Sequence, residues 1–345
     1  MTTLIKELDE LINEKYANHL GVKIGVGDKV LFEKYASPNN KFDENSMIEV
    51  ASVTKMVVTT SLALVAMTKG LLSKDDLVSK FFEVPDDRKN LTIENVMTHS
   101  IGYGGGNLCL NSVTRETVQK TILSKPMTFT PGERTEYSCL AFILLGKILE
   151  QIFNEDLDTA FKNYVAKPLG MLNSTFNYKD DGNYLINVQQ SYEARTLVND
   201  FNARYLGGMV GNAGLFTCMK DCSLFVKMLL NDGQPIISKE VFDLAIKNYT
   251  KNPKDQSRGL GFLYVDEKYT QTANLFPVGS IGHCGHTGQS IFIDPISKLY
   301  VIILSDATKT TYEKLGYGDY NKAIELRTRI HKAIKQDLEK SKHFL

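Results

Sequence analysis

Apolar residues recur at helical spacing near both ends of the chain. Near the N-terminus the repeat passes through Leu4, Leu8, Leu11 and Ile12. This spacing predicts an amphipathic helix that docks one face on a core. Residues 320–338 carry a similar repeat and predict a second amphipathic helix close to the C-terminus.

Short β-rich runs lie next to these predicted helices. Residues 22–26 and 29–34 flank a Gly-Asp pair, which predicts a hairpin because glycine accepts the positive φ of a tight turn. Residues 290–293 and 299–304 flank the turn sequence Asp-Pro-Ile-Ser and predict a second hairpin. The sequence therefore places strands near both ends of the chain.

Helical patterns fill much of the middle of the chain. An apolar stretch over residues 53–69 predicts a buried helix that ends at Gly70, a residue type common just after a last helical turn. Further helices are predicted over residues 92–98, 138–153 and 156–165.

The glycine-rich segment 208–214 superficially resembles a phosphate-binding loop. It contains no lysine, and the residues after it do not open a dinucleotide-binding helix. We interpret it as a tight turn that precedes a helix over residues 219–231.

Together these elements predict an α/β (α+β) fold. An antiparallel sheet would form from both chain ends, flanked by helices, and a mostly helical subdomain would be inserted between its halves. Residues 1–80 and 200–345 would form the sheet subdomain and residues 81–199 the helical one. The active site would lie at their interface.

Composition and charge narrow the classes of partner. The 40 basic and 40 acidic residues cancel, so no net field favours nucleic acid or an anionic membrane, and we expect neither as a partner. The longest apolar run, residues 56–67, is too short to span a bilayer. The oligomeric state stays open.

The N-terminal residues lack the cationic start and apolar stretch of a secretion signal. If Met1 is the natural start, this predicts a cytoplasmic protein. The five cysteines suit a reducing compartment and suggest no disulfide framework. They are Cys109, Cys139, Cys218, Cys222 and Cys284.

The pair Ser52 and Lys55 is the strongest chemical signal. The two residues are three positions apart, so they share one face of the predicted helix. Serine is a weak nucleophile until a base takes its proton, and a neutral lysine amine can be that base. Lowering a lysine pKa from about 10.4 to about 7 costs roughly 4–5 kcal/mol, and we expect burial and nearby cations to supply the shift. Ser52 would also present a free backbone N–H at the first helical turn.

Tyr137 follows Pro131-Gly132 and precedes the helix predicted over residues 138–153. A phenol at such a junction can pass a proton between a nucleophile and a leaving group. A tyrosine there can equally be an amphipathic packing residue.

The sequence His283-Cys284-Gly285-His286 stands just before the second predicted hairpin. Glycine there lets a ligand approach the backbone of an edge strand closely. A free N–H of this segment could join that of Ser52 in an oxyanion hole. The segment also contains metal-ligand types, but their adjacent spacing fits no usual zinc pattern. We therefore expect no metal and no cofactor.

Several ordered segments match the motifs of one enzyme family. They are EVASVTK (49–55), GLLSKDD (70–76), TIENVMTHS (92–100), PG (131–132) with YS (137–138), PLGM (168–171), GNAGLFTCMKD (211–221) and GHCGHTGQSIFIDP (282–295). In this order they resemble the serine β-lactamase and penicillin-binding-protein family, especially its branch of class C β-lactamases, DD-peptidases and esterases. The resemblance covers most of the chain and implies a β-lactamase/transpeptidase-like fold with acyl-enzyme chemistry.

The resemblance implies a role for each matching residue. Ser52 would be the nucleophile, Lys55 its base partner and Tyr137 the acid/base. His283 would be the polar group of the third motif, where the family has Lys-Thr-Gly. His286 would supply the second oxyanion N–H.

The substrate-binding positions depart from the family pattern. Cys139 stands where the family usually has an asparagine that holds an acylamino group. Cys284, next to Gly285, stands where a threonine hydroxyl often meets a substrate carboxylate. Thiols are poor hydrogen-bond partners, so the hydrogen bonds that usually hold β-lactams and peptides are weakened. The two thiols could also lie together and make the site oxidisable, or each could be a separate packing residue.

These features predict a serine hydrolase that forms an acyl-enzyme on Ser52 and hydrolyses a small ester or amide. An esterase or D-amino-acid-peptidase-like activity is favoured, with weak activity on a β-lactam-like substrate. The alternative is a catalytically idle ligand-binding or scaffold relative that keeps the fold, which Cys139 and Cys284 would support.

Overall fold

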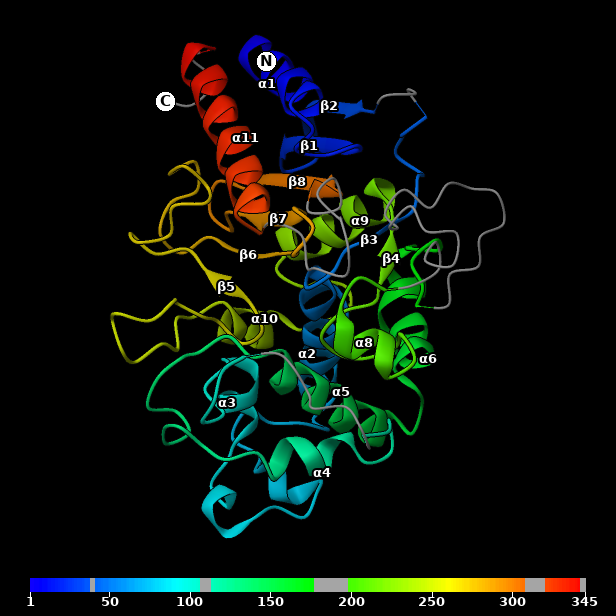
Figure 1. The fold of residues 1–345 in the computed structure, drawn as a ribbon, viewed down its shortest axis with the longest axis vertical. Coiled ribbons are helices and arrows are strands. Elements are labelled where there is room, and N and C mark those ends of the chain that lie inside the picture. Colours follow the sequence, from blue (N-terminus) through cyan, green and yellow to red (C-terminus); the bar gives the residue numbers. More distant parts are fainter. Residues whose placement is uncertain (38–40, 106–112, 177–197, 308–319, 342–345) are drawn as a thin grey trace.

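The computed structural model describes residues 1–37, 41–105, 113–176, 198–307 and 320–341 (Figure 1). Its largest sheet is six-stranded and antiparallel, in the order β2-β1-β8-β7-β6-β5. The strands are β1 (Leu20–Val26), β2 (Lys29–Ala36), β5 (Leu263–Tyr264), β6 (Ile281–Cys284), β7 (Ser290–Ile293) and β8 (Leu299–Ser305). Because β1 pairs with both β2 and β8, the two chain ends share one sheet, which confirms the predicted fold class.

Both predicted hairpins are present. β1 and β2 join through Gly27-Asp28, and Gly27 has a φ of 57°, in the left-handed region that glycine enters without strain. β7 and β8 join through a turn in which the Asp294 carboxylate accepts the N–H groups of Ile296 and Ser297 at 3.0 and 3.1 Å. Such side-chain-to-backbone bonds are a common way to stabilise a turn.

The two terminal helices cover one face of the sheet. α1 (Thr2–Asn13) and α11 (Tyr320–Lys340) pack in one apolar core with alternate residues of β1 and β8. Arg329 of α11 reaches Glu7 and Glu14 of α1, with 2.6 Å between Arg329 Nη1 and Glu14 Oε2. The first and last helices are therefore fastened to each other as well as to the sheet.

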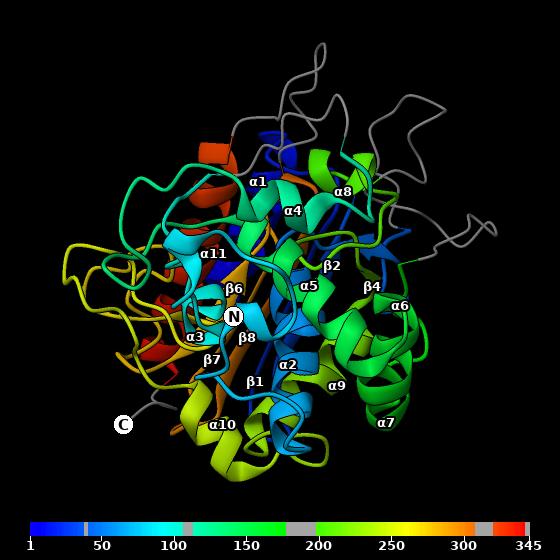
Figure 2. The same cartoon turned by 90° about the horizontal axis from the view of Figure 1, so that it is seen from below.

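The opposite face carries a larger core. Val301 and Ile303 of β8 face α1 and α11, whereas Ile302 and Leu304 belong to the core on the other side, as the two-residue period of a strand requires. That core includes α2 (Ser61–Thr68), α5 (Cys139–Phe153) and α9 (Met219–Leu230). Figure 2 shows α9 and α11 on opposite sides of the strands.

The remaining elements are short. A two-stranded sheet pairs β3 with β4, and several helices and helical turns complete the helical part of the chain. Their bounds are β3 (Ile48–Glu49), β4 (Phe216–Thr217), α3 (Ile93–Met97), α4 (Val118–Leu123), α6 (Leu157–Phe161), α7 (Lys167–Leu169), α8 (Phe201–Tyr205), α10 (Lys239–Ala245), the 3₁₀ turns Val78–Lys80 and Asp86–Arg88, and the π-helical turn Lys162–Ala166.

The larger core contains residues from both predicted subdomains, for example Leu144 and Phe225. The division of the chain at residues 80 and 200 stays a prediction. Within the described ranges, no helix is long and apolar enough to cross a membrane.

The helix predicted over residues 53–69 differs from expectation at its start. Lys55–Thr60 is π-helical, and the α-helix α2 begins only at Ser61. In an α-helix each N–H donates to the carbonyl four residues earlier, and in a π-helix to the carbonyl five residues earlier. A run of apolar residues fits either pattern, so the sequence could not show the π-helical start. Segments of π-helix occur frequently at functional sites.

We expect Leu8→Ala to lower the free energy of unfolding by about 2–5 kcal/mol, because it opens a cavity between α1, α11 and the sheet. Leu8 is fully buried, and the same helix offers a control in Ile5, which is 41% exposed. Ile5→Ala should change the free energy by no more than about 0.5 kcal/mol. Urea unfolding of both variants checks this, and equal effects would contradict the packing of α1 described above.

Candidate active site

Ser52 lies in a tight turn between β3 and the π-helical segment. Three successive backbone hydrogen bonds of 3.0 Å, each spanning three residues, are accepted by the carbonyls of Val50, Ala51 and Ser52. Ala51 has a φ of 47°, an uncommon value for a residue with a side chain. The turn projects Ser52 from the start of a buried helix. Among the described residues, none accepts a backbone hydrogen bond from the Ser52 N–H.

The Ser52 hydroxyl is in contact with both predicted partners. Its Oγ lies 3.0 Å from Lys55 Nζ and accepts a 2.8 Å hydrogen bond from the Tyr137 hydroxyl. Tyr137 immediately precedes Ser138, the residue that caps α5 by accepting from the Ala141 N–H. The starts of two helices that are distant in sequence therefore meet at one hydroxyl.

Lys55 is fully buried, and its Nζ donates hydrogen bonds to three neighbours. They are the Asn212 carbonyl oxygen at 2.8 Å, Ser52 Oγ at 3.0 Å and Cys139 Sγ at 3.6 Å. An ammonium group has three donors and no acceptor. The surroundings of Lys55 thus match the charged form of the side chain.

The pKa of Lys55 is raised above the ordinary value of 10.5. Burial lowers the pKa, but charge interactions with Cys139 and Tyr137 and a hydrogen bond to Tyr137 raise it, and the balance is upward. The expectation that the surroundings lower this pKa towards neutrality is therefore wrong. Its physical reason is that the nearest titratable groups favour an ammonium, whereas the expected effect required cations beside the amine.

Tyr137 is a protonated phenol at neutral pH. Burial raises the pKa of Tyr137 to about 12, although the charge of Lys55 and hydrogen bonds with Lys55 and Ser52 lower it. The side chain is nevertheless 37% exposed, so one side of it can meet a substrate. At rest the site therefore holds an ammonium, a phenol and a hydroxyl.

The ring of His99 packs against the ring of Tyr137. Its ring centroid lies 4.7 Å from that of Tyr137 and 4.9 Å from that of Phe142. Its Nδ1 lies 3.1 Å from both the backbone nitrogen and the carbonyl oxygen of Ser138. Burial, followed by the charges of Arg258 and Lys55, holds the pKa of His99 well below its usual range, so the ring is neutral.

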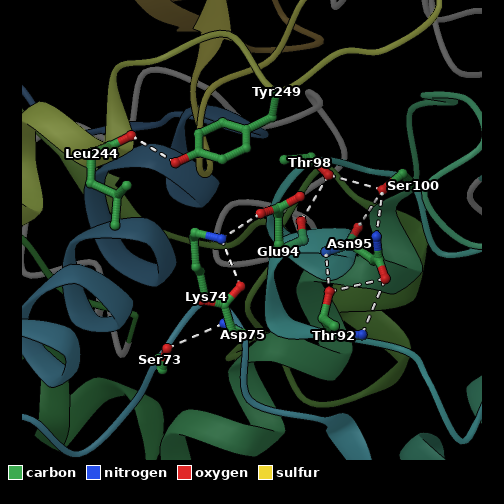
Figure 3. A network of polar contacts seen from close by, with 10 residues as sticks. All are labelled: Ser73, Lys74, Asp75, Thr92, Glu94, Asn95, Thr98, Ser100, Leu244 and Tyr249. Carbon is green, nitrogen blue, oxygen red and sulfur yellow. Dashed lines mark hydrogen bonds and ion pairs between the residues drawn. The ribbon is translucent and has the colours of Figure 1, made fainter.

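A polar network fixes the turn that carries His99 (Figure 3). Thr92 and Asn95 form a capping box at the start of α3. The Asn95 amide donates to Ser100 Oγ at 3.3 Å, and Ser100 Oγ lies 2.9 Å from Thr98 Oγ1. These bonds hold the residues on both sides of His99, whose φ is 58°. The residue pattern predicts a helix over residues 92–98, but only the family resemblance singles out this stretch as a motif.

The glycine-rich segment before β4 contributes more than the predicted tight turn. The turn is present, since Val210 and Ala213 pair across it. In addition, its Asn212 carbonyl binds Lys55, and its Gly211 carbonyl accepts from Thr59 Oγ1 at 2.6 Å. Sequence reasoning missed this role because a backbone carbonyl has no residue signature.

His283 lies on β6 with its ring centroid 6.3 Å from that of Tyr137. Its Nδ1 lies 3.0 Å from the Cys284 carbonyl oxygen, which can only accept, so Nδ1 carries the hydrogen. Burial and the charges of Lys55 and Arg258 hold the pKa of His283 well below its usual range. The ring is therefore neutral, and its Nε2 is a buried acceptor without a described partner. It cannot supply the positive charge of the lysine that it replaces.

The two motif cysteines have different surroundings. Cys139 Sγ is 3.6 Å from Lys55 Nζ, whereas Cys284 Sγ is 3.2 Å from the Tyr269 hydroxyl. Both are free thiols and are not bonded to each other. Their joint oxidation stays a hypothesis. Cys109 lies outside the described residues.

The end of β6 lies close to the turn that carries Ser52. A Cβ on Gly285 would lie 2.8 Å from the Val50 carbonyl oxygen, a contact that real Cβ atoms do not make. Arg327 of α11 donates to the Gly285 carbonyl at 3.0 Å and holds this edge in place. His286 follows with its ring stacked on Tyr320 at 5.1 Å. Its part in an oxyanion hole stays a prediction.

Within the described part of the chain, no group of three His, Cys, Asp or Glu side chains is arranged to hold a metal ion. Ser52, Lys55 and Tyr137 place a hydroxyl between an amine and a phenol, an arrangement that is chemically capable of acyl transfer.

Comparison with known proteins identifies the family of the chain. The β-lactamase family profile matches residues 8–320. The chain belongs to the β-lactamase family. Family and relatives together indicate a hydrolase of the serine β-lactamase and penicillin-binding-protein type.

This β-lactamase-family chain has a relative in Salmonella typhimurium named as a candidate D-alanyl-D-alanine carboxypeptidase. The two are 29% identical over 301 residues, which cover 76% of this chain and 69% of the relative. EstCE1, named as a hydrolase with promiscuous acyltransferase activity, has the same fold, with a TM-score of 0.76 and 19% identity over 96% of this chain and 99% of EstCE1. The octameric penicillin-binding protein homologue of Pyrococcus abyssi gives a TM-score of 0.72 and 23% identity over 98% of this chain and 81% of that one.

The raised pKa of Lys55 leads to a prediction for the pH dependence of this family member. If acylation requires loss of one proton from the Lys55, Tyr137 and Ser52 group, the competent fraction rises with pH and stays small below the Lys55 pKa. We expect kcat/KM for a short-chain nitrophenyl ester to rise about tenfold per pH unit between about pH 7 and 9. Initial rates measure this dependence after the rate seen with the Ser52→Ala variant has been subtracted at each pH. A plateau near pH 7.5 would show instead that the Lys55 pKa is lowered.

Proposed function

We propose that this protein is a hydrolase that forms an acyl-enzyme on Ser52 and cleaves a small ester or amide. One observation carries the proposal: Ser52 Oγ lies within 3.0 Å of both a buried amine and a phenol. A serine hydroxyl needs a neighbouring proton acceptor to become a nucleophile, and these are the two groups that contact it.

In the acylation step, Ser52 Oγ attacks the substrate carbonyl carbon. Its proton passes to the Lys55–Tyr137 pair, which has first released one proton to solvent. The bond from the carbonyl carbon to the leaving group then breaks, and the leaving group takes a proton from Tyr137. Deacylation repeats these transfers with water as the nucleophile, and Ser52 leaves with a proton from the same pair.

The charge on Lys55 has a second use in this scheme. As Ser52 Oγ loses its proton and attacks, negative charge develops on it, and the buried ammonium 3.0 Å away stabilises that charge. In the tetrahedral intermediate the charge is on the former carbonyl oxygen. The backbone N–H of Ser52 is available for the substrate oxyanion. Removing one oxyanion donor typically costs about 3–4 kcal/mol of transition-state stabilisation.

The substrate-binding positions favour an esterase or a D-amino-acid-peptidase-like activity, with a weak β-lactamase activity beside it. Cys139 offers a thiol where the family usually offers an amide, and the Cys284 thiol is directed to Tyr269. The names of the relatives, a carboxypeptidase and a hydrolase with acyltransferase activity, support the same range of activities.

Active-site labelling tests the proposal. We expect wild-type protein to be labelled by a fluorophosphonate and, more slowly, by a fluorescent penicillin, and to hydrolyse short nitrophenyl esters. Ser52→Ala should abolish labelling by either probe and reduce ester hydrolysis to the uncatalysed rate, because the attacking oxygen is gone. Gel fluorescence and initial rates measure both effects.

Ser124→Ala is the matched control, since Ser124 is exposed and far from this turn in sequence. It should keep labelling and activity. If neither probe labels the wild type and esters, D-alanyl peptides and nitrocefin are all left intact, the idle scaffold alternative replaces the hydrolase.

A further inference from the structure

Gln289 is a fully buried glutamine in the loop between β6 and β7. Its amide nitrogen donates to the carbonyl oxygen of Glu49 at 2.9 Å and to that of Ser305 at 2.7 Å. Its amide oxygen accepts from Thr287 Oγ1 at 2.7 Å. A side-chain amide has two N–H donors, so both are used. One side chain therefore joins β3, the end of β8 and the β6–β7 loop.

The bond to Glu49 reaches the segment that carries Ser52. Glu49 is the last residue of β3 and stands three positions before Ser52. Its carboxylate accepts the N–H of Ala51 at 2.9 Å, and the carbonyl of the next residue, Val50, accepts the first hydrogen bond of the Ser52 turn. Gln289 is thus hydrogen-bonded to the start of the turn that positions Ser52.

The other bonds of Gln289 hold the residues on both sides of His286. The Gly285 N–H donates to the Gln289 carbonyl at 2.8 Å, and the Thr287 hydroxyl donates to the Gln289 side chain. Gly285 is confined between two segments, since a Cβ there would lie 2.5 Å from Gln289 Oε1 and 2.8 Å from the Val50 carbonyl oxygen. The distance between this loop and the Ser52 turn therefore depends on Gln289.

Further hydrogen bonds fix the loop on its other side. Ser305 Oγ donates to the Thr287 carbonyl at 2.8 Å, and the Ala307 N–H donates to the same oxygen at 2.9 Å. Thr287, Gln289 and Ser305 are all fully buried, where the loss of one hydrogen-bond partner is costly. These bonds anchor the loop to β8, whereas the bond from Gln289 to Glu49 anchors it to the segment of Ser52.

We propose that Gln289 is a positioning residue that sets the spacing between the Ser52 N–H and the loop backbone at His286, the two sides of the oxyanion site. The inference rests on the proposed function and on the predicted oxyanion role of His286. Oxyanion donors act when they are held about 2.7–3.1 Å from the charged oxygen and need no reorganisation during the reaction. A buried amide that is bonded to both backbone segments supplies that rigidity.

Two esters that differ in one atom test the inference. Attack by Ser52 develops negative charge on oxygen in nitrophenyl acetate, but on sulfur in nitrophenyl thionoacetate, where sulfur replaces the carbonyl oxygen. Sulfur is a weak hydrogen-bond acceptor, so well-placed N–H donors favour the oxygen ester. Gln289→Met keeps the length of the side chain and removes the amide. We expect it to lower kcat/KM for the oxygen ester about 10–100-fold and the ratio of the two kcat/KM values about tenfold.

Thr287 offers a pair of variants on the same set of bonds. Thr287→Val keeps the shape of the side chain but removes the hydrogen bond to Gln289 Oε1. The ratio of the two kcat/KM values should fall about fivefold, the effect of one typical hydrogen bond. Thr287→Ser keeps the hydroxyl and should keep the wild-type ratio.

Asp337→Ala is the matched control. Asp337 also joins distant segments, since its carboxylate on α11 accepts the N–H groups of Thr3 and Leu4 at 3.1 and 2.9 Å. These bonds lie between the two terminal helices and not at the Ser52 turn. The variant should lose stability but keep the wild-type ratio of the two esters.

Labelling with a fluorophosphonate, taken to completion, counts the reactive sites in each variant, and every rate is divided by that number. If Gln289→Met and Thr287→Val change both esters by the same factor, the inference is wrong and the proposed function stands. The same holds if the wild-type ratio equals that of uncatalysed hydrolysis in buffer. If Gln289→Met does not fold, the Thr287 pair decides alone. A wild type that is not labelled and hydrolyses neither ester overturns the proposed function, and this inference with it.

Discussion

The buried ammonium of Lys55 is the interaction on which the site depends. It binds the hydroxyl of Ser52, the carbonyl of Asn212 and the sulfur of Cys139, which belong to three separate segments of the chain. A buried charge is costly unless it is well hydrogen-bonded, so these segments must meet at one point. The π-helical start of the Lys55 helix and the packing of α5 bring them there.

Charge also sets the protonation of the neighbouring groups. Lys55, Arg258 and Arg327 are all buried, and their positive charges together with burial keep His283 neutral. A neutral His283 with its hydrogen on Nδ1 is a hydrogen-bond acceptor towards the site. The surroundings of Tyr137 are therefore electropositive, because the buried side chains Lys55 and Arg258 are cationic and His283 is neutral.

Local patterns predicted much of the architecture. The hairpin at Gly27-Asp28 follows from the turn residues, and the docking of α1 follows from the helical spacing of its leucines. β8 reads as a continuous apolar run because both of its faces are covered. The spacing of Ser52 and Lys55 was sufficient to place the two side chains together, and ordered motifs linked Tyr137 to them.

By itself the sequence determined the sheet built from both chain ends and the identity of the Ser52, Lys55 and Tyr137 group, because spacing and turn chemistry are local properties. Only the tertiary structure decided the π-helical geometry after Ser52, the carbonyl of Asn212 beside Lys55, and the packing of Tyr137 against His99 and Arg258. It also decided the direction of the Lys55 pKa shift. These properties depend on which groups from distant segments surround a buried atom, and a linear pattern carries no record of those neighbours.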